Sequence, residues 1–321
     1  MTKIQGYDIY PSIIKIPQVG VGTVSDHIKE TGSTALLLPP GSRAAVDVAG
    51  GAPATRETPV LDPANLVAGP DAIILSGGSA LGLETADGAA KVLRRYHRGF
   101  PVANIHIPIV VAACIFDLGY GQPQPPTWED GQKAMQEALN NPASGPIAEG
   151  SEGAGTGATV GKSLGPELAM KGGQAAVSLI TSTGLVVAAL MVVNAMGSIF
   201  DDDGRILAGP QDKKGKAQPT SPAMWEKNPD VLSPGESTTI GAIITNGRLS
   251  KAELLRVCRM GHDGLARAID PVHTPWDGDT LFAVSAGDFQ TAPVIVGALA
   301  AHAVSLAIRR AVVLANKPSN T

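Results

Sequence analysis

The stretch STTIGAIITN, Ser237 to Asn246, decides the fold expected of this chain. Its β-branched residues predict a strand, and two adjacent threonines, Thr238 and Thr239, open it. The segment before it, residues 201–237, is polar and rich in Pro, Gly, Asp and Lys. Because a loop of that length in a compact domain is usually functional, the point at which it enters the strand is the first place to look for chemistry.

A second stretch, HTPWDGDTLFAVSAG at residues 273–287, places Asp277 and Asp279 on either side of Gly278, just before another predicted strand. A threonine hydroxyl is a poor nucleophile unless a base lies beside it. When threonine is the first residue of a chain, its own α-amine, with a pKa near ~8, can be that base. Thr-Thr also fits ordinary β-propensity and Asp-Gly-Asp also fits a turn, so spacing alone leaves both interpretations open.

Short apolar runs alternate with helical patterns along the rest of the chain, which is typical of layered α/β or α+β proteins. Further strands are predicted at residues 34–39, 71–78 and 107–119, and a strand pair at residues 175–195. Helices are predicted at residues 81–96, 250–269 and about 291–315. Ser250 and Glu253 form a capping box at the start of the second of these helices.

The composition predicts a substantial core, since 44% of the 321 residues are hydrophobic and 17% are charged. The net charge of -4 and the lack of a long basic run argue against nucleic acid as a partner. No apolar signal segment opens the chain, and the most apolar run, from Leu185, is too short to span a membrane, so we expect a buried strand there. Cys114 and Cys258 are expected to be buried free thiols of a cytoplasmic protein.

The glycine-rich stretch GTGATVGKS, Gly155 to Ser163, approaches a phosphate-binding loop but carries Thr156 where that pattern needs glycine. Glycine-rich loops more often mark tight turns or close backbone contacts. A nucleotide-binding protein is therefore a weaker alternative, as is an uncleaved binding protein without activity. The histidines show no ligand spacing for zinc, and we expect no metal and no cofactor; His262 and His273 lie nearest to the threonine and carboxylate stretches.

These stretches and several others resemble one family of self-processing hydrolases. STTIGAIITN and DGDTLFAVS are similar to sequences of nylon-oligomer hydrolases and of D- and β-aminopeptidases. GSRAAVDVAGGAP, LSGGSALGLETADG, IFDLG, GAGTGATVGK and MVVNAMG resemble the same family in the same order, so the similarity covers most of the chain. The resemblance implies the N-terminal nucleophile hydrolase class and its α/β fold, a four-layer αββα sandwich.

In that family the precursor cuts itself directly before the nucleophile, and the matching bond here is Ser237–Thr238. The resemblance thus implies an N-terminal fragment, residues 1–237, and a C-terminal fragment, residues 238–321, that together form one compact domain. Thr238 would be the nucleophile, with Asp277 and Asp279 as the carboxylate partners of its hydroxyl and α-ammonium.

Lys162 and Asn194 match the other active-site positions of the family. The resemblance implies that Lys162 stabilises the alkoxide of the nucleophile by its charge. Asn194 would donate a hydrogen bond to the oxyanion of the tetrahedral intermediate. Without the resemblance, the same two residues fit a surface lysine on a loop and an asparagine in the turn after a strand.

Two positions depart from the nylon-oligomer hydrolases, which carry tyrosine at the place of Phe116 and asparagine at the place of Ser237. Phe116 lacks the tyrosine hydroxyl, so any substrate contact made by that hydroxyl would be missing here. Because the side chain of Ser237 is shorter than that of asparagine, we expect slow or incomplete self-cleavage. Phe116 and Trp276 are expected to line the substrate cleft, although Trp276 also fits a side chain that packs under its own turn.

The expected function is amide hydrolysis through an acyl-enzyme on Thr238. The first substrate class is oligomers of the nylon or 6-aminohexanoate type, and the alternative is small peptides with D- or β-aminoacyl N-termini. A third, weaker possibility is acetyl transfer, which a related fold performs in arginine biosynthesis. The resemblance also implies that the processed units assemble into a homotetramer.

Overall fold

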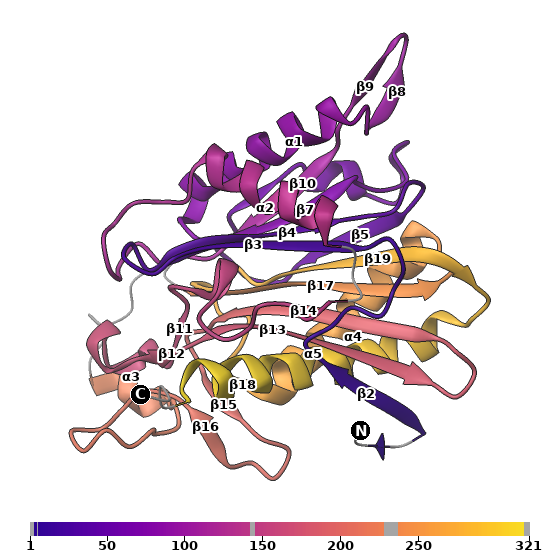
Figure 1. Ribbon diagram of the computed structural model, residues 1–321. Helices are drawn as coiled ribbons and strands as arrows, with labels where there is room; N and C mark the ends of the chain where they lie inside the picture. The colour runs from indigo at the N-terminus through magenta and orange to yellow at the C-terminus, as the bar shows by residue number, and fades with distance from the viewer. Residues whose placement is uncertain (1–2, 5, 142–144, 228–236, 318–321) are drawn as a thin grey trace.

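The computed structural model describes residues 3–4, 6–141, 145–227 and 237–317, which form two stacked sheets between two layers of helices (Figure 1). The larger sheet has seven strands in the order β1 (Lys3–Ile4), β2 (Tyr7–Pro11), β13 (Gly173–Thr181), β14 (Val186–Asn194), β17 (Thr238–Gly247), β19 (Thr280–Phe289) and β5 (Arg43–Val48). The smaller sheet has five strands in the order β3 (Gly20–Asp26), β4 (Thr31–Leu37), β7 (Ala72–Ser76), β10 (Val110–Cys114) and β6 (Thr55–Arg56).

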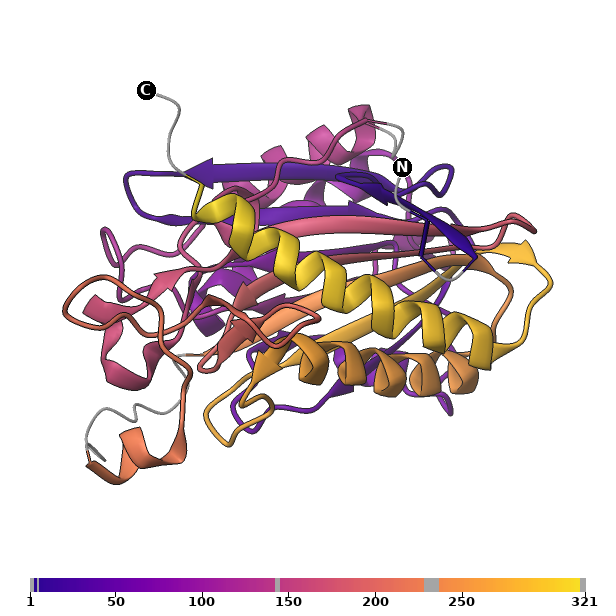
Figure 2. The same cartoon turned by 90° about the horizontal axis from the view of Figure 1, so that it is seen from below.

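Four long helices cover the outer faces of the sheets. Helices α4 (Lys251–Ala268) and α5 (Pro293–Ala315) lie side by side on the seven-stranded sheet, as Figure 2 shows from below. Helices α1 (Thr85–Arg95) and α2 (Trp128–Asn140) cover the five-stranded sheet. The layer order is therefore helix, sheet, sheet, helix, which agrees with the αββα sandwich expected from the sequence.

Smaller elements complete the chain. The short strands are β8 (Phe100–Val102), β9 (Ile105–Ile107), β11 (Thr159–Val160), β12 (Met170–Lys171), β15 (Ser198–Phe200), β16 (Ile206–Ala208) and β18 (Ile269–Asp270). The short helices are α3 (Pro222–Lys227) and the 3₁₀ turns η1 (Thr58–Leu61), η2 (Ser79–Glu84), η3 (Gly153–Gly155), η4 (Lys162–Leu164) and η5 (Pro166–Leu168). The polar segment 201–237 thus contains β16 and α3, and residues 228–236 lie outside the described part of the chain.

Strand β14 shows why its sequence is apolar at every position. Val187 and Met191 point into the core beneath α4 and α5, whereas Ala188 and Leu190 point into the core between the two sheets. Alternate side chains of a strand face opposite sides, so a strand covered on both faces needs no polar positions. The apolar run from Leu185 is therefore a buried strand, as predicted.

Helix α5 is the one described helix that is long and apolar enough to cross a membrane, by length and composition alone. In the fold, 61% of its most apolar window is buried inside the protein, where it packs on α4, β13 and β14. Its apolar character is therefore explained by the core of the seven-stranded sheet.

Most predicted elements are confirmed, with different ends. The predicted strand at residues 107–119 is β10 alone, because the chain leaves the sheet after Cys114. The predicted helix at residues 81–96 begins with the 3₁₀ turn η2 and becomes α-helical at Thr85. The capping box of Ser250 and Glu253 is present at the start of α4, and both cysteines are free and buried. Helix α2 was not predicted.

Candidate active site

The ends of two neighbouring strands bring Asn194 and Thr238 together. Strands β14 and β17 are antiparallel, and Asn194, the last residue of β14, lies opposite Thr238, the first residue of β17. Both are buried, with Asn194 at 0% and Thr238 at 3% exposed. The sheet therefore fixes the spacing of two predicted site residues that are far apart in the sequence.

The Asp277–Asp279 turn lies at the same edge of the sheet, because β17 and β19 run parallel and both begin there. The Thr239 amide donates a 2.6 Å hydrogen bond to Asp279 Oδ1. Ser237 pairs with Asp277 in a single parallel bridge, and the Gly278 amide donates a 2.9 Å hydrogen bond to the Ser237 carbonyl oxygen. The turn thus contacts the residues on both sides of the predicted cleavage point.

A close approach explains why glycine separates the two carboxylates. A Cβ atom at Gly278 would lie 2.8 Å from Thr238 Oγ1 and 2.8 Å from the carbonyl oxygen of Ala52, closer than real Cβ contacts allow. The Ala52 amide also donates a 2.8 Å hydrogen bond to the Asp277 carbonyl oxygen. The stretch GSRAAVDVAGGAP, which includes Ala52, therefore holds the turn against β17.

A hydroxyl and a backbone amide both donate hydrogen bonds to the carbonyl oxygen of the bond between Ser237 and Thr238. Thr238 Oγ1 donates a 2.5 Å hydrogen bond to the carbonyl oxygen of Ser237, and the Gly278 amide donates to the same oxygen. Ser237 is fully buried and its own hydroxyl has no hydrogen-bond partner among the described residues. The sequence did not indicate the donor at Gly278, because a backbone amide leaves no residue-type signal.

Lys162 contacts Asn194 in the same cluster. It is 6% exposed, and its Nζ donates hydrogen bonds of 2.9 Å to Asn194 Oδ1 and 3.1 Å to the Asn194 carbonyl oxygen. Gly161 before it has a φ of 74°, in the left-handed region, and a Cβ there would lie 2.2 Å from the carbonyl carbon of Gly209. The glycine-rich stretch is therefore a tight turn that aims Lys162 at Asn194.

The geometry of a phosphate-binding loop is missing around this turn. Such a loop connects a strand to the N-terminus of a helix, whereas Lys162 here begins the three-residue 3₁₀ turn η4. The nucleotide-binding alternative therefore loses the structural context that it requires.

Further contacts fix the orientation of the Asn194 amide. Its Oδ1 accepts a 3.0 Å hydrogen bond from the Thr159 amide in addition to the bond from Lys162. Its Nδ2 donates a 2.9 Å hydrogen bond to the backbone carbonyl of Phe116. Phe116 therefore contacts the site through its backbone, and its side chain and that of Trp276 are half-buried, so their role in lining a substrate cleft stays a prediction.

Burial and the nearby Asp279 charge raise the pKa of Asp277 above its ordinary value. Two hydrogen bonds from Thr274 to Asp277 Oδ2, 2.6 Å from the hydroxyl and 2.9 Å from the amide, oppose this rise, as does the charge of Lys162. The first two effects prevail, so one of the two neighbouring carboxylates binds a proton more readily than an exposed aspartate does.

Asp117 is a carboxylate that the sequence analysis did not single out. It is buried directly after β10, where Thr31 Oγ1 donates to its Oδ2 at 2.6 Å and the Gly78 amide donates to its Oδ1 at 2.7 Å. Burial raises its pKa to about 6, against the lowering effects of Thr31, Gly78 and Lys162. The available signal was an aspartate immediately after an apolar strand, in the stretch IFDLG.

His273 is a second side chain whose place the sequence did not predict. Its Nδ1 lies 2.8 Å from Asp279 Oδ2 and its backbone amide donates to the same oxygen at 3.1 Å. Within the described part of the chain, no group of three or more His, Cys, Asp or Glu could hold a metal ion.

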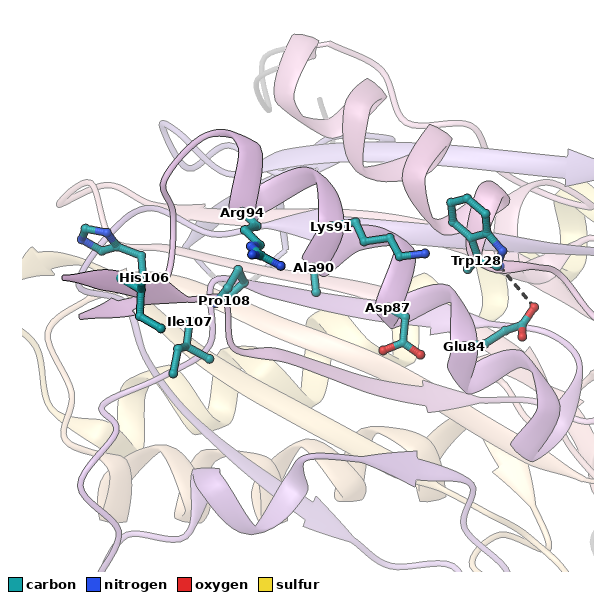
Figure 3. Close-up of a pocket in the computed structure, with 10 residues that line it drawn as sticks. Glu84, Asp87, Ala90, Lys91, Arg94, His106, Ile107, Pro108 and Trp128 are labelled. Atoms are coloured by element: carbon teal, nitrogen blue, oxygen red, sulfur yellow. Dashed lines mark hydrogen bonds between the residues drawn. The ribbon is translucent and has the colours of Figure 1, made fainter. Parts of the chain in front are cut away.

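A pocket of about 660 Å³ lies elsewhere, between the outer face of α1 and the projecting strand β9 (Figure 3). Lys91 stands 3.6 Å from the ring centroid of Trp128 at one end of it, and Glu84 accepts a hydrogen bond from the Trp128 amide. None of the residues predicted for catalysis lines this pocket.

Comparison with known proteins agrees with this geometry. The model of peptidase family S58 matches residues 11–319. An uncharacterized aminopeptidase of Mycobacterium leprae is 40% identical over 263 residues, which cover 80% of this chain and 71% of the relative. A 6-aminohexanoate-oligomer endohydrolase of Kocuria sp. is 33% identical over 291 residues, which cover 86% and 76% of the two chains.

Among solved structures, the L-aminopeptidase D-Ala-esterase/amidase of Ochrobactrum anthropi, described as a variant of the Ntn hydrolase fold, superposes with a TM-score of 0.67. The match covers 98% of this chain and 87% of that one at 19% sequence identity, and so bears on the fold alone. The predicted fold class is thereby confirmed. This chain belongs to peptidase family S58 and is a hydrolase of peptide or amide bonds with the N-terminal nucleophile hydrolase fold.

Proposed function

We propose that this protein is a self-processing aminopeptidase whose nucleophile is Thr238, acting on small peptides with a free N-terminus, including D- and β-aminoacyl ones. The observation that carries the proposal is the 2.5 Å hydrogen bond from the Thr238 hydroxyl to the carbonyl oxygen of Ser237. It places the hydroxyl beside the carbonyl group that it would attack. The relatives named as aminopeptidases reach 40% identity and those named as oligomer hydrolases 33%, which favours small peptides over 6-aminohexanoate oligomers as substrates.

Self-cleavage begins when Thr238 Oγ1 attacks the Ser237 carbonyl carbon. Negative charge develops on the carbonyl oxygen, where the Gly278 amide donates a hydrogen bond at 2.9 Å. The C–N bond then breaks, the nitrogen takes the proton that the hydroxyl gave up, and the acyl group rests on Oγ1 as an ester. Water hydrolyses the ester, leaving a carboxylate on Ser237 and an amino group on Thr238.

In each later turnover the new α-amine of Thr238 takes the proton of its own hydroxyl as that oxygen attacks the substrate carbonyl. Lys162, which the Asn194 side chain holds beside the strand pair, lowers the energy of the developing negative charge. The protonated α-amine gives its proton to the leaving amine, and water releases the acyl group.

The test uses the purified full chain. Mass spectrometry is expected to find two fragments, residues 1–237 and 238–321, and Thr238→Ala is expected to stay intact and inactive. β-Alanyl and D-alanyl p-nitroanilides should be cleaved, and their N-acetylated forms should resist cleavage, because an aminopeptidase needs the free amine. An intact wild-type chain with full amidase activity would contradict the use of the α-amine as base.

Hydrolysis of 6-aminohexanoate oligomers is the second candidate, supported by the relatives at 33% identity. An endohydrolase cuts inside its substrate, so N-acetylation of such an oligomer should leave its rate nearly unchanged. Comparison of free and acetylated forms of both substrate classes therefore separates the two activities. Assembly into homotetramers stays a prediction that sedimentation of the processed protein at micromolar concentration can test.

A further inference from the structure

His273 stands directly behind one of the two carboxylates of the site. Its ring Nδ1 lies 2.8 Å from Asp279 Oδ2, and its own backbone amide donates to that oxygen at 3.1 Å. On the other side of the carboxylate, the Thr239 amide donates to Asp279 Oδ1 at 2.6 Å. Among the described residues, three nitrogens therefore contact the Asp279 carboxylate, and His273 supplies two of them.

The backbone at His273 is held in an unusual conformation to make these contacts. Its φ of 56° lies in the left-handed region, which a histidine adopts only at a cost unless the surroundings favour it. In this conformation the backbone amide and the ring of one residue reach the same carboxylate oxygen. The strained turn is therefore explained by the double contact with Asp279.

The surroundings of the ring identify its tautomer. Nε2 of His273 is buried without a hydrogen-bond partner among the described residues, and the ring of His262 packs edge to face on the His273 ring at 4.6 Å between centroids. A protonated Nε2 would be a buried donor with no acceptor among the described residues, which costs more than an unpaired acceptor. The proton therefore belongs on Nδ1, where Asp279 accepts it.

The two carboxylates of the site consequently differ. Among the described residues, the Asp279 carboxylate accepts hydrogen bonds from N–H groups, all of which favour its ionised form. The Asp277 carboxylate accepts from the amide and the hydroxyl of Thr274, both on a single oxygen. When two neighbouring carboxylates share a site, the difference in their hydrogen bonds decides which one keeps the charge.

We infer that His273 is a positioning residue that keeps Asp279 ionised beside Thr238, so that a proton bound by the pair resides on Asp277. The inference rests on the proposed function, since it assigns the charge that faces the α-amine of a processed Thr238. An ionised Asp279 at that place orients the amine, and a neutral Asp277 avoids a second negative charge that would hold the amine protonated.

Three further charged or titratable residues lie near His273 and the two carboxylates, namely His262, Asp47 and Lys162. His262 approaches from α4, and burial lowers its pKa, so it is uncharged near neutral pH. Asp47 on β5 lies behind His262, with its carbonyl oxygen 3.3 Å and its carboxylate 3.5 Å from Nε2. Lys162 acts on Asp277 from the opposite side and lowers its pKa.

Two substitutions that both tolerate a positive φ isolate the ring donor. His273→Gly removes Nδ1 and keeps the backbone amide, whereas His273→Asn replaces Nδ1–H with a side-chain N–H in nearly the same place. We expect the acidic limb of the kcat/KM profile to move up by about one pH unit in His273→Gly, with roughly a tenfold loss near pH 6 and recovery above pH 8. His273→Asn should keep the limb within about 0.3 pH unit of the wild type.

A uniform loss at every pH in His273→Gly, or the same profile in both variants, would overturn the inference. Should His273→Gly fail to fold, ¹⁵N NMR of histidine-labelled wild-type protein decides the matter at pH 8. The expected result is a protonated Nδ1 and an unprotonated Nε2 at His273, and the opposite tautomer or an imidazolium contradicts it. A wild-type chain that neither cuts itself nor hydrolyses amides counts instead against the proposed function, which the NMR result does not require.

Discussion

The Gly278 amide donates a 2.9 Å hydrogen bond to the carbonyl oxygen of Ser237, the oxygen that would become negative during self-cleavage. The donor belongs to the glycine between the two carboxylates, so one turn supplies both the oxyanion contact and the charged groups. This relationship leads to the first of five predictions.

Gly278→Ala is expected to slow self-cleavage at least tenfold, because the new Cβ would lie 2.8 Å from Thr238 Oγ1 and push the hydroxyl or the turn out of place. The measurement is the fraction of cut chain against time on denaturing gels. Gly119→Ala is the matched control, since a Cβ there meets only Phe116 Cε1 at 3.8 Å. Equal rates in the two variants would argue against the Gly278 contact.

Ser237→Ala is expected to process at the wild-type rate, because the Ser237 hydroxyl has no hydrogen-bond partner among the described residues. Ser237→Asn, the residue that the resembling hydrolases carry, is expected to process faster because its amide can hold the bond in place. Mass spectrometry of samples taken over several days measures both. A Ser237→Ala chain that no longer cuts itself would show that the hydroxyl takes part in the reaction.

Lys162→Met is expected to lower turnover by on the order of a hundredfold while the fold remains, because it removes the cation beside the developing charge. Circular dichroism and the unfolding temperature check the fold, and p-nitroanilide hydrolysis measures the rate. Lys213→Met, in the exposed Lys213–Lys216 loop, is the control and should behave like the wild type. Normal turnover in Lys162→Met would remove Lys162 from the mechanism.

Asp279→Asn is expected to lose most amidase activity, on the order of a hundredfold or more, and Asp277→Asn a smaller part of it, because an uncharged asparagine resembles a protonated Asp277. The loss should be larger in Asp279→Asn. Both Asp279 oxygens accept hydrogen bonds from N–H groups, and the amide NH₂ of an asparagine would face one of these donors. Initial rates of both variants with one substrate measure which loss is larger. The extent of self-cleavage is confirmed for each variant first. Near wild-type turnover in both variants would contradict the site.

Asp117 is expected to make stability fall as the pH rises from about 4 to about 6. Its pKa is raised from 3.8 to about 6 in the folded protein, so the folded state binds the proton more tightly than the unfolded chain. The stabilisation is therefore fully present below about pH 4 and lost as the pH passes through about 6. Because a tenfold difference in proton affinity corresponds to ~1.4 kcal/mol, the upper limit of this stabilisation is about 3 kcal/mol.

Urea unfolding of the wild type and of Asp117→Asn at pH 4.5 and pH 7 measures this effect. The wild type should be favoured over the variant more strongly at pH 4.5 than at pH 7. The same difference between the two proteins at both pH values would show that Asp117 titrates normally.

Strand patterns predicted that Thr238 opens a strand and that Asp277 and Asp279 precede another, and they left the roles of these residues open. The resemblance assigned these three residues and Asn194 to one site, and the register of β14 with β17 places Asn194 opposite Thr238. A layered fold followed from apolar runs that alternate with helical patterns, whereas the αββα order followed from the resemblance.

The parts that the sequence missed depend on contacts between distant loops. The Asp117 carboxylate accepts hydrogen bonds from Thr31 and from the Gly78 amide. No local sequence pattern predicts that these three segments lie close together. His273 reaches Asp279 only because its backbone takes a positive φ, which the residue type does not indicate. Both contacts arise from tertiary packing, and local sequence patterns do not predict it.

The order of strands in the seven-stranded sheet gives a cut at Ser237–Thr238 a particular outcome. Strands β17 and β19, from the C-terminal side of the cut, lie between β14 and β5, from the N-terminal side. Strands β17 and β19 of one product would fill the space between β14 and β5 of the other, so the two products would share one sheet. Neither could diffuse away without unfolding both, so one broken peptide bond would turn a single chain into a permanent heterodimer whose subunits have to be made together.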